Sequence, residues 1–325
     1  MQSRFRAKSK ISRRMVDSPT RTFKERGGRS IRQVPQGKER EKVAVERPPV
    51  REVGFPEELQ EPWSVFKTDA ELKAHQDYSA AKAGDGEAAI RLVGDLGGPL
   101  FDRAAGGLTL DDIWFVAPHA VEAAGDNAIP QTLATYLAIV TDGNVDNTIV
   151  QASKVFHTGA GAMERLIARP VFSGYVRPVR YFLVDDVTTL GGTLAELSDF
   201  IRRNGGEVVG AAVLVDANRS GRLSIERNLV TQLSRRHGNE IKAIFGIEIQ
   251  ALTQGEGRYL FNFKTSDDIR GRCIKAREET YRRLRSKESF WSSHKGQARP
   301  RVSWLRRKSR VVHQQTLRPQ KGPTS

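Results

Sequence analysis

The stretch LVDDVTTLGGTL, Leu183 to Leu194, decides the fold that we predict for this chain. An apolar run, Val179 to Val184, is typical of a strand buried in a parallel sheet, and two adjacent carboxylates follow it. A loop of threonine and glycine then leads into a helical pattern. Because ligands of open parallel sheets bind beyond the carboxyl ends of the strands, we expect Asp185 and Asp186 at the mouth of a crevice.

The loop after the acidic pair is suited to a phosphate group. Glycines let backbone amides approach an anion, and Thr189 and Thr193 add hydroxyl donors beside a helix N-terminus. Carboxylates next to this site repel a phosphate unless they bind hydroxyl groups or a metal ion, and a sugar phosphate with magnesium satisfies both demands. The alternative, that Asp185 and Asp186 only cap the turn, gives no reason for two such carboxylates to tolerate each other.

The flanking segments extend this unit into an α/β fold. Ile113 to Ala117 (IWFVA) is a second apolar run, and Pro130 suits the first turn of a helix after it. Val208 to Val215 (VVGAAVLV) predicts a third strand, and a strand, crossover helix and strand of this length form a right-handed parallel unit. The remaining patterns predict two helices over Thr68 to Leu96 broken at Gly84 to Gly86, a helix over Ile225 to Arg236, a strand over Ile241 to Ile249, a capping box at Thr253 and Glu256, and a charged helix over Asp267 to Lys287.

The run from Leu183 to Leu194 resembles the phosphoribosyl pyrophosphate (PRPP) signature of type I phosphoribosyltransferases. In that family the acidic pair holds the ribose hydroxyls and the loop cradles the 5′-phosphate. The resemblance implies a type I phosphoribosyltransferase-like parallel sheet and a magnesium-dependent transfer of ribosyl phosphate from PRPP to a base or another nucleophile. It assigns catalysis and magnesium binding to Asp185 and Asp186, and phosphate binding to Val187, Thr188, Thr189, Leu190, Gly191, Gly192 and Thr193. Leu190 departs from the family pattern, which has a threonine or a similar small residue there.

The resemblance covers roughly Asp111 to Asp216. Pro118, His119 and Ala120 stand where the family keeps its pyrophosphate loop, and the segment from Lys154 to Arg165 stands where it keeps a flexible loop. Transfer from PRPP requires positive charge at the leaving pyrophosphate, yet the loop from residue 118 to residue 127 contains no lysine or arginine. Lys154 and Arg165, which are otherwise ordinary surface residues, are therefore the candidate catalytic cations.

Two short motifs are similar to a narrower group of proteins. HTGA at His157 to Ala160 and TLAEL at Thr193 to Leu197 resemble phosphoribosyltransferase-like proteins encoded on bacterial mobile elements. This similarity implies a bacterial cytoplasmic protein and leaves the acceptor base and a homodimer open. The competing hypothesis is a non-catalytic module that senses PRPP or a nucleotide, or scaffolds a nucleic-acid complex through its basic arms. The neutral-to-acidic pyrophosphate loop and Leu190 favour it.

Charge divides the chain of 325 residues into three blocks. The net charge is +10 over residues 1–50, −9 over 51–269 and +14 over 270–325. Basic segments of low hydrophobicity bury too little apolar surface to fold, so we expect disordered arms whose partners, if they are more than solvated spacers, are polyanions such as nucleic acid. We predict a basic arm at 1–50, a helical lead-in at 51–110, a phosphoribosyltransferase-like domain at 111–269, a charged helix at 270–288 and a basic tail at 289–325.

The single cysteine, Cys273, excludes an intramolecular disulfide and fits a reducing compartment. The sequence has no 18-residue apolar run and no apolar core of a secretory signal. We therefore expect a cytoplasmic protein with no membrane partner.

Overall fold

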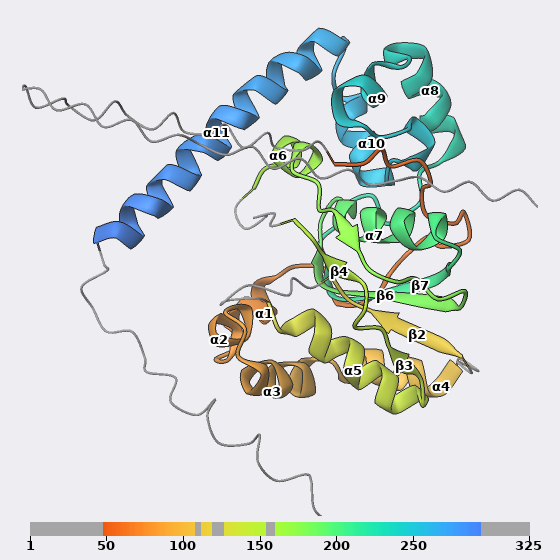
Figure 1. The fold of residues 1–325 in the computed structure, drawn as a ribbon, viewed down its shortest axis with the longest axis vertical. Coiled ribbons are helices and arrows are strands. Elements are labelled where there is room, and N and C mark those ends of the chain that lie inside the picture. The colour runs from red at the N-terminus through yellow and green to blue at the C-terminus, as the bar shows by residue number, and fades with distance from the viewer. Residues whose placement is uncertain (1–47, 108–111, 119–126, 154–159, 294–325) are drawn as a thin grey trace, which may run out of the picture. The chain divides into compact units, whose positions relative to one another are not determined.

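Five strands form the central sheet of the protein, in the order β1-β7-β6-β2-β3 (Figure 1). The structure is a computed structural model that describes residues 48–107, 112–118, 127–153 and 160–293. Every neighbouring pair in this sheet runs parallel, which confirms the predicted fold class of an α/β parallel sheet flanked by helices. The strands are β1 Trp63–Phe66, β2 Ile113–Val116, β3 Asn144–Val145, β6 Arg180–Thr188 and β7 Glu207–Asp216, and a separate antiparallel pair consists of β4 Val150–Gln151 and β5 Phe172–Ser173.

The pairing of the strands leaves one end of β6 without a neighbour on the side of β2. β6 pairs with β7 along its whole length, as far as Thr188 opposite Asp216. β2 pairs with β6 only as far as Val116 opposite Leu183. The residues of β6 after Leu183, which include the acidic pair, therefore extend beyond the end of β2.

Helices cover both faces of the sheet, because the central strands β2, β6 and β7 are apolar on both sides (Figure 1). On one face, Leu92 of α3 and Leu133 of α5 pack in the same core as Phe182 of β6. On the other face, Leu197 of α7 packs in the core that contains Leu183. The helices of the first face are α1 Ala70–Ala74, α2 Tyr78–Lys82, α3 Gly86–Leu96, α4 Gly98–Gly107 and α5 Ile129–Thr141, and that of the second is α7 Gly192–Arg203.

A third hydrophobic cluster joins α6 to the helices that follow β7. Ile269, Cys273 and Ala276 form a buried stripe on α11 at helix spacing, and Met163 of α6 belongs to the same cluster. None of the described helices is both long and apolar enough to cross a membrane. These helices are α6 Ala162–Ile167, α8 Arg227–His237, α9 Glu240–Phe245, the 3₁₀-helix Ile249–Ala251, α10 Gln254–Phe261 and α11 Ser266–Ser293.

Two segments differ from the predictions made from sequence. The strand predicted over Ile241 to Ile249 is wrong: its first half is α9, because Ile241 and Phe245 lie four residues apart on one helix face and Gly246, at φ +67°, ends the helix. The segment predicted as a helical lead-in also contributes β1, which pairs with β7 at the edge of the sheet. The predicted break at Gly84 to Gly86 does separate α2 from α3, but the segment before it forms two short helices, α1 and α2, instead of one. Both basic arms lie largely outside the described residues.

Candidate functional site

The carboxyl ends of β2 and β6 form a topological switch point. The chain leaving β2 forms α5 on one face of the sheet and returns to β3, whereas the chain leaving β6 forms α7 on the other face and returns to β7. Open α/β sheets bind ligands in the crevice between two such strands. Asp185 and Asp186 lie at this crevice, on the part of β6 that extends beyond β2.

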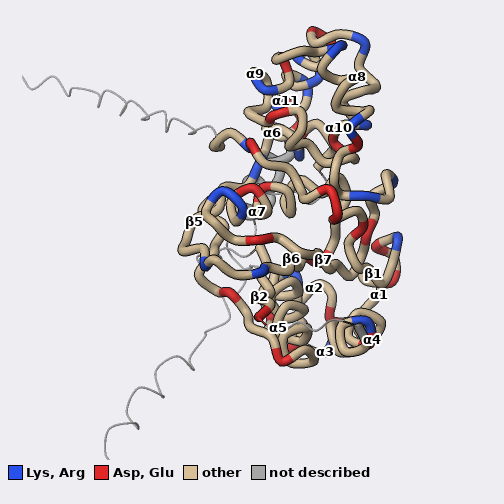
Figure 2. Tube along the Cα trace, turned by 90° about the vertical axis from the view of Figure 1, so that its right-hand side faces the viewer, with Lys and Arg blue, Asp and Glu red and all other residues tan. Residues whose placement is uncertain are grey.

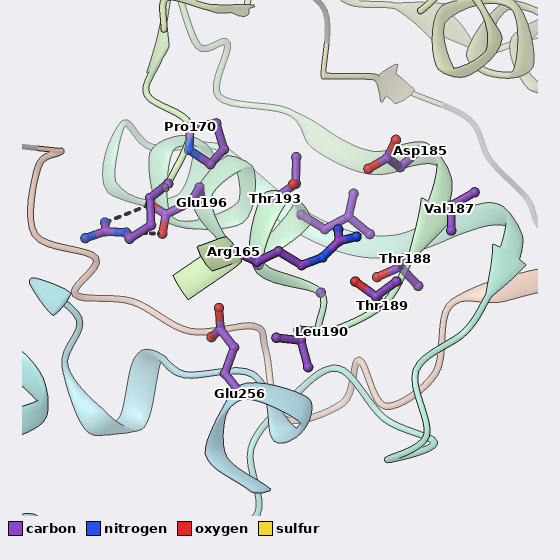
Figure 3. Close-up of a pocket in the computed structure, with 14 residues that line it drawn as sticks. Arg165, Pro170, Asp185, Val187, Thr188, Thr189, Leu190, Thr193, Glu196 and Glu256 are labelled. Carbon is purple, nitrogen blue, oxygen red and sulfur yellow. Dashed lines mark hydrogen bonds and ion pairs between the residues drawn. The ribbon is translucent and has the colours of Figure 1, made fainter. Parts of the chain in front are cut away.

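The loop between β6 and α7 lines a cleft at the start of α7 (Figure 3). All seven residues predicted to bind phosphate, Val187 to Thr193, line this cleft together with Asp185. Gly191 precedes α7 with φ +80°, a conformation that favours glycine, and no side chain caps the helix. The first backbone N–H groups of α7 are therefore available to an anion at the helix N-terminus.

Close packing from α10 fixes the backbone of this loop. Thr253 and Glu256 form the predicted capping box of α10, and the Thr253 hydroxyl also donates a hydrogen bond of 2.5 Å to the carbonyl oxygen of Leu190. A Cβ atom on Gly192 would lie 2.9 Å from Glu256 Oε1, so only glycine fits without displacing that carboxylate. At Leu190 the loop is held through its main chain, which any residue supplies.

Four buried charges lie behind the loop, and three of them, Arg169, Glu196 and Glu256, line the cleft. The Arg169 guanidinium binds both oxygens of Glu196, at 2.6 and 2.9 Å (Figure 3). Arg51 pairs with Glu256 and lies 3.3 Å from Glu196. Because each carboxylate has an arginine partner, Glu196 and Glu256 present little net negative charge to an anion at α7.

The surroundings of Asp185 disfavour the ionised form of its carboxyl group. Burial and the neighbouring charge of Asp186 raise the pKa of Asp185 well above its usual range. Its Oδ1 accepts a hydrogen bond of 2.8 Å from the Asp186 amide, which offsets only part of this cost. A ligand that brings hydroxyl groups or a cation to Asp185 would lower the cost of ionising this carboxyl group.

This raised pKa predicts that Asp185→Asn stabilises the unliganded protein at neutral and alkaline pH. Ionising Asp185 costs more in the folded than in the unfolded chain, so the penalty is absent below the ordinary pKa of 3.8 and complete above the raised one. We expect the free energy of unfolding at pH 8 to rise by about 0.5–2 kcal/mol, the usual gain from relieving a strained functional site. At pH 3.5 the gain should vanish. Urea unfolding at both pH values, with Asp102→Asn on the exposed face of α4 as the control, checks this; an equal gain at both would contradict it.

Asp186 has partners that the sequence did not reveal. Its Oδ2 lies 2.5 Å from Lys82 Nζ and accepts a hydrogen bond of 3.0 Å from Asn127 Nδ2. Its Oδ1 accepts a bond of 2.9 Å from the Val187 amide. Lys82 ends a short helix about a hundred residues upstream, and nothing in the local pattern around it signals a contact with the acidic pair.

Of the two candidate cations predicted from the sequence, the structure describes Arg165 but not Lys154. Arg165, on α6, lines the cleft, and its side chain reaches over the loop on the side of Thr188 and Thr189 (Figure 3). Lys154 lies outside the described residues, as do His119, Ala120 and His157. Pro118 lies two residues after the end of β2, at the switch point.

Charged residues of both signs occur along α9 and α11, whereas α8 carries arginines and no acidic residue (Figure 2). Several of the basic residues there have acidic partners, such as Arg270 with Asp267 at 2.8 Å. This part of the chain gives no support of its own to a nucleic-acid interface.

Comparison with curated proteins finds two relatives. The chain is 38% identical to Protein TraN of Escherichia coli over 234 residues, which is 70% of this chain and 52% of the relative. It is also 38% identical over 133 residues to an uncharacterized protein of Haemophilus influenzae, covering 39% of this chain and 29% of that one. The chain thus spans about half the length of the first relative and less of the second. No family model matches the chain.

Similar solved structures include adenine phosphoribosyltransferases. That of Trypanosoma brucei, in complex with AMP, pyrophosphate and ribose-5-phosphate, is 10% identical, with 51% of this chain and 71% of the other covered and a TM-score of 0.27. That of Thermoanaerobacter pseudethanolicus is 15% identical, with 43% and 73% covered and a TM-score of 0.25. A TM-score this low establishes no shared function, so the proposal below rests on the geometry of the site.

Proposed function

We propose that this chain binds PRPP at the switch point and transfers its ribosyl phosphate to a nitrogenous base or a related nucleophile. The observation that carries the proposal is the pairing, at one crevice, of an uncapped helix N-terminus with the carboxylate of Asp185. The amides of α7 suit a 5′-phosphate, and a carboxylate at the adjoining strand end suits ribose hydroxyls. PRPP carries both groups on one ribose ring.

In this reaction the bond from C1′ to the pyrophosphate oxygen breaks and a bond from C1′ to the acceptor nitrogen forms. Pyrophosphate leaves with the electron pair, and a proton on the reacting nitrogen passes to water or to the departing pyrophosphate. The Thr189 and Thr193 hydroxyls and the α7 amides would hold the phosphate while Asp185 orients the ring. Arg165 would lie over the loop and exclude water from that side.

Magnesium fits one member of the acidic pair better than the other. Asp185 lines the cleft, and its raised pKa would return toward normal beside a cation. Asp186 already has both oxygens engaged, by the Val187 amide and by Lys82 and Asn127. We therefore assign the predicted magnesium contact mainly to Asp185, where the ion would neutralise charge on the phosphorylated ligand.

Turnover separates this enzyme from a non-catalytic PRPP sensor. The full chain, incubated with PRPP, magnesium and a panel of purine and pyrimidine bases, should release pyrophosphate with at least one base, and Asp185→Asn should remove that release. Asp102→Asn serves as the control. Binding of PRPP without release for any base would retire the enzyme and leave the sensor.

A further inference from the structure

We propose that Lys82 supplies the positive charge for the second anionic group of the ligand, the pyrophosphate of PRPP. This inference rests on the proposed function and names a residue for the part of the site that the sequence leaves without a cation. The loop from residue 118 to residue 127 has no lysine or arginine. An ammonium group brought in from α2 fills that gap.

Lys82 is held at the crevice by the docking of α2 against the start of α5. The Ala128 amide donates a hydrogen bond of 3.0 Å to the carbonyl oxygen of Ala81, the residue before Lys82. Asn127, the neighbour of Ala128, donates to the same Asp186 oxygen that Lys82 contacts. The ammonium is thereby fixed beside the part of β6 that extends beyond β2, on the face of the sheet opposite α7.

Exposure shows which part of the ion pair a ligand would meet. The Asp186 side chain is 6% exposed, whereas the Lys82 side chain is 31% exposed. A ligand approaching the crevice therefore has more access to the Lys82 side chain than to the Asp186 carboxylate. One ammonium carries three N–H groups, so a contact with Asp186 leaves donors for a phosphate oxygen.

The charge of Lys82 is secure at any pH near neutrality. Burial lowers the pKa of Lys82, but the carboxylates of Asp186 and, more weakly, Asp185 outweigh it and raise the pKa above its usual value. The ion pair with Asp186, the residue after Asp185, puts the ammonium beside the acidic pair. A ligand spanning from the α7 loop across Asp185 would bring its second anionic group to this point.

The stability of the folded protein does not by itself explain the ion pair between Lys82 and Asp186. A buried or half-buried ion pair contributes little more than apolar residues of the same size would, because desolvation offsets the attraction. The remaining structural explanation is that Lys82 only neutralises Asp186. The two explanations differ for a protein in which Asp186 is neutral. If Lys82 only neutralises Asp186, it has no role left there, whereas the proposal predicts that it still binds pyrophosphate.

The test measures binding of inorganic pyrophosphate, in EDTA so that no divalent cation contributes, by calorimetry on the full chain. We expect Asp186→Asn to bind pyrophosphate at least as tightly as the wild type. The double variant Lys82→Met with Asp186→Asn should bind it about tenfold or more weakly, the usual loss for a charge-assisted hydrogen bond. Lys73→Met, on the exposed face of α1, is the matched lysine control and should change nothing.

Equal pyrophosphate affinities for Asp186→Asn and the double variant would overturn the proposal, as would a wild-type protein that binds no pyrophosphate. Ribose 5-phosphate, measured on the same proteins, reports on the α7 loop instead. If pyrophosphate binding depends on Lys82 while neither ribose 5-phosphate nor PRPP binds, the proposed function fails and the assignment of Lys82 as an anion-binding cation stands.

Discussion

Replacing Asp185 and Asp186 together with asparagine should abolish the thermal stabilisation of the protein by PRPP. In the wild type, PRPP at a hundred times its dissociation constant should raise the free energy of unfolding by about 2.7 kcal/mol. Each carboxylate that accepts a hydrogen bond from a ribose hydroxyl contributes about 1.5–3 kcal/mol of that binding. Asp185→Asn alone should therefore weaken PRPP about 10- to 100-fold, and the double variant should show no shift in Tm.

The double asparagine variant should keep the fold of the wild type. Asparagine has the shape of aspartate, and Asp185 Oδ1 accepts from a backbone amide, a bond that an asparagine oxygen keeps. The double variant should unfold cooperatively, so a lost ligand effect is not a lost fold. Asp102→Asn should keep the full PRPP shift. A double variant stabilised by PRPP as strongly as the wild type would remove Asp185 and Asp186 from the site.

Arg51→Met should destabilise the protein by about 3–5 kcal/mol, the usual cost of removing one partner from a buried ion pair. The Arg51 side chain is fully buried, and its guanidinium pairs with Glu256 and Glu196 behind the phosphate loop. Methionine fills much of the same volume but takes away the arginine that pairs with Glu256 and leaves Glu196 with Arg169. Urea unfolding at pH 7 measures the loss.

A surface ion pair gives the matched control for this variant. Arg91 binds Asp77 through two nitrogens, at 3.0 and 2.6 Å, but its side chain is 53% exposed. Because water screens such a pair, Arg91→Met should cost no more than about 1 kcal/mol. Arg51→Lys should lie between the two, since one ammonium cannot span both carboxylates as a guanidinium does. Equal losses for Arg51→Met and Arg91→Met would show that the buried cluster contributes nothing special.

The fold was largely readable from local patterns. The apolar runs before Asp185 and Asp216 form neighbouring strands as predicted, because a strand buried on both faces needs an uninterrupted apolar sequence. The helix after Gly191 and the capping box at Thr253 were equally clear, since each depends on residues only a few positions apart. The strand predicted over Ile241 to Ile249 was wrong because the local residues of this segment do not decide its structure. Its apolar residues fit a strand or a helix, and packing against α11 decided for the helix.

The candidate site also has one part that local sequence predicts and another that it does not. The sequence by itself determined the acidic pair and the loop that follows it, because twelve consecutive residues carry the strand end, the glycine turn and the helix start. The tertiary structure alone decided which groups meet that loop. Lys82, Asn127, Arg51 and Glu256 come from four distant segments, and each reaches the loop or the acidic pair only through helix packing on the sheet. Local propensity acts over a few residues, whereas the charge balance of a crevice depends on contacts between elements far apart in the chain, and only the folded structure specifies those.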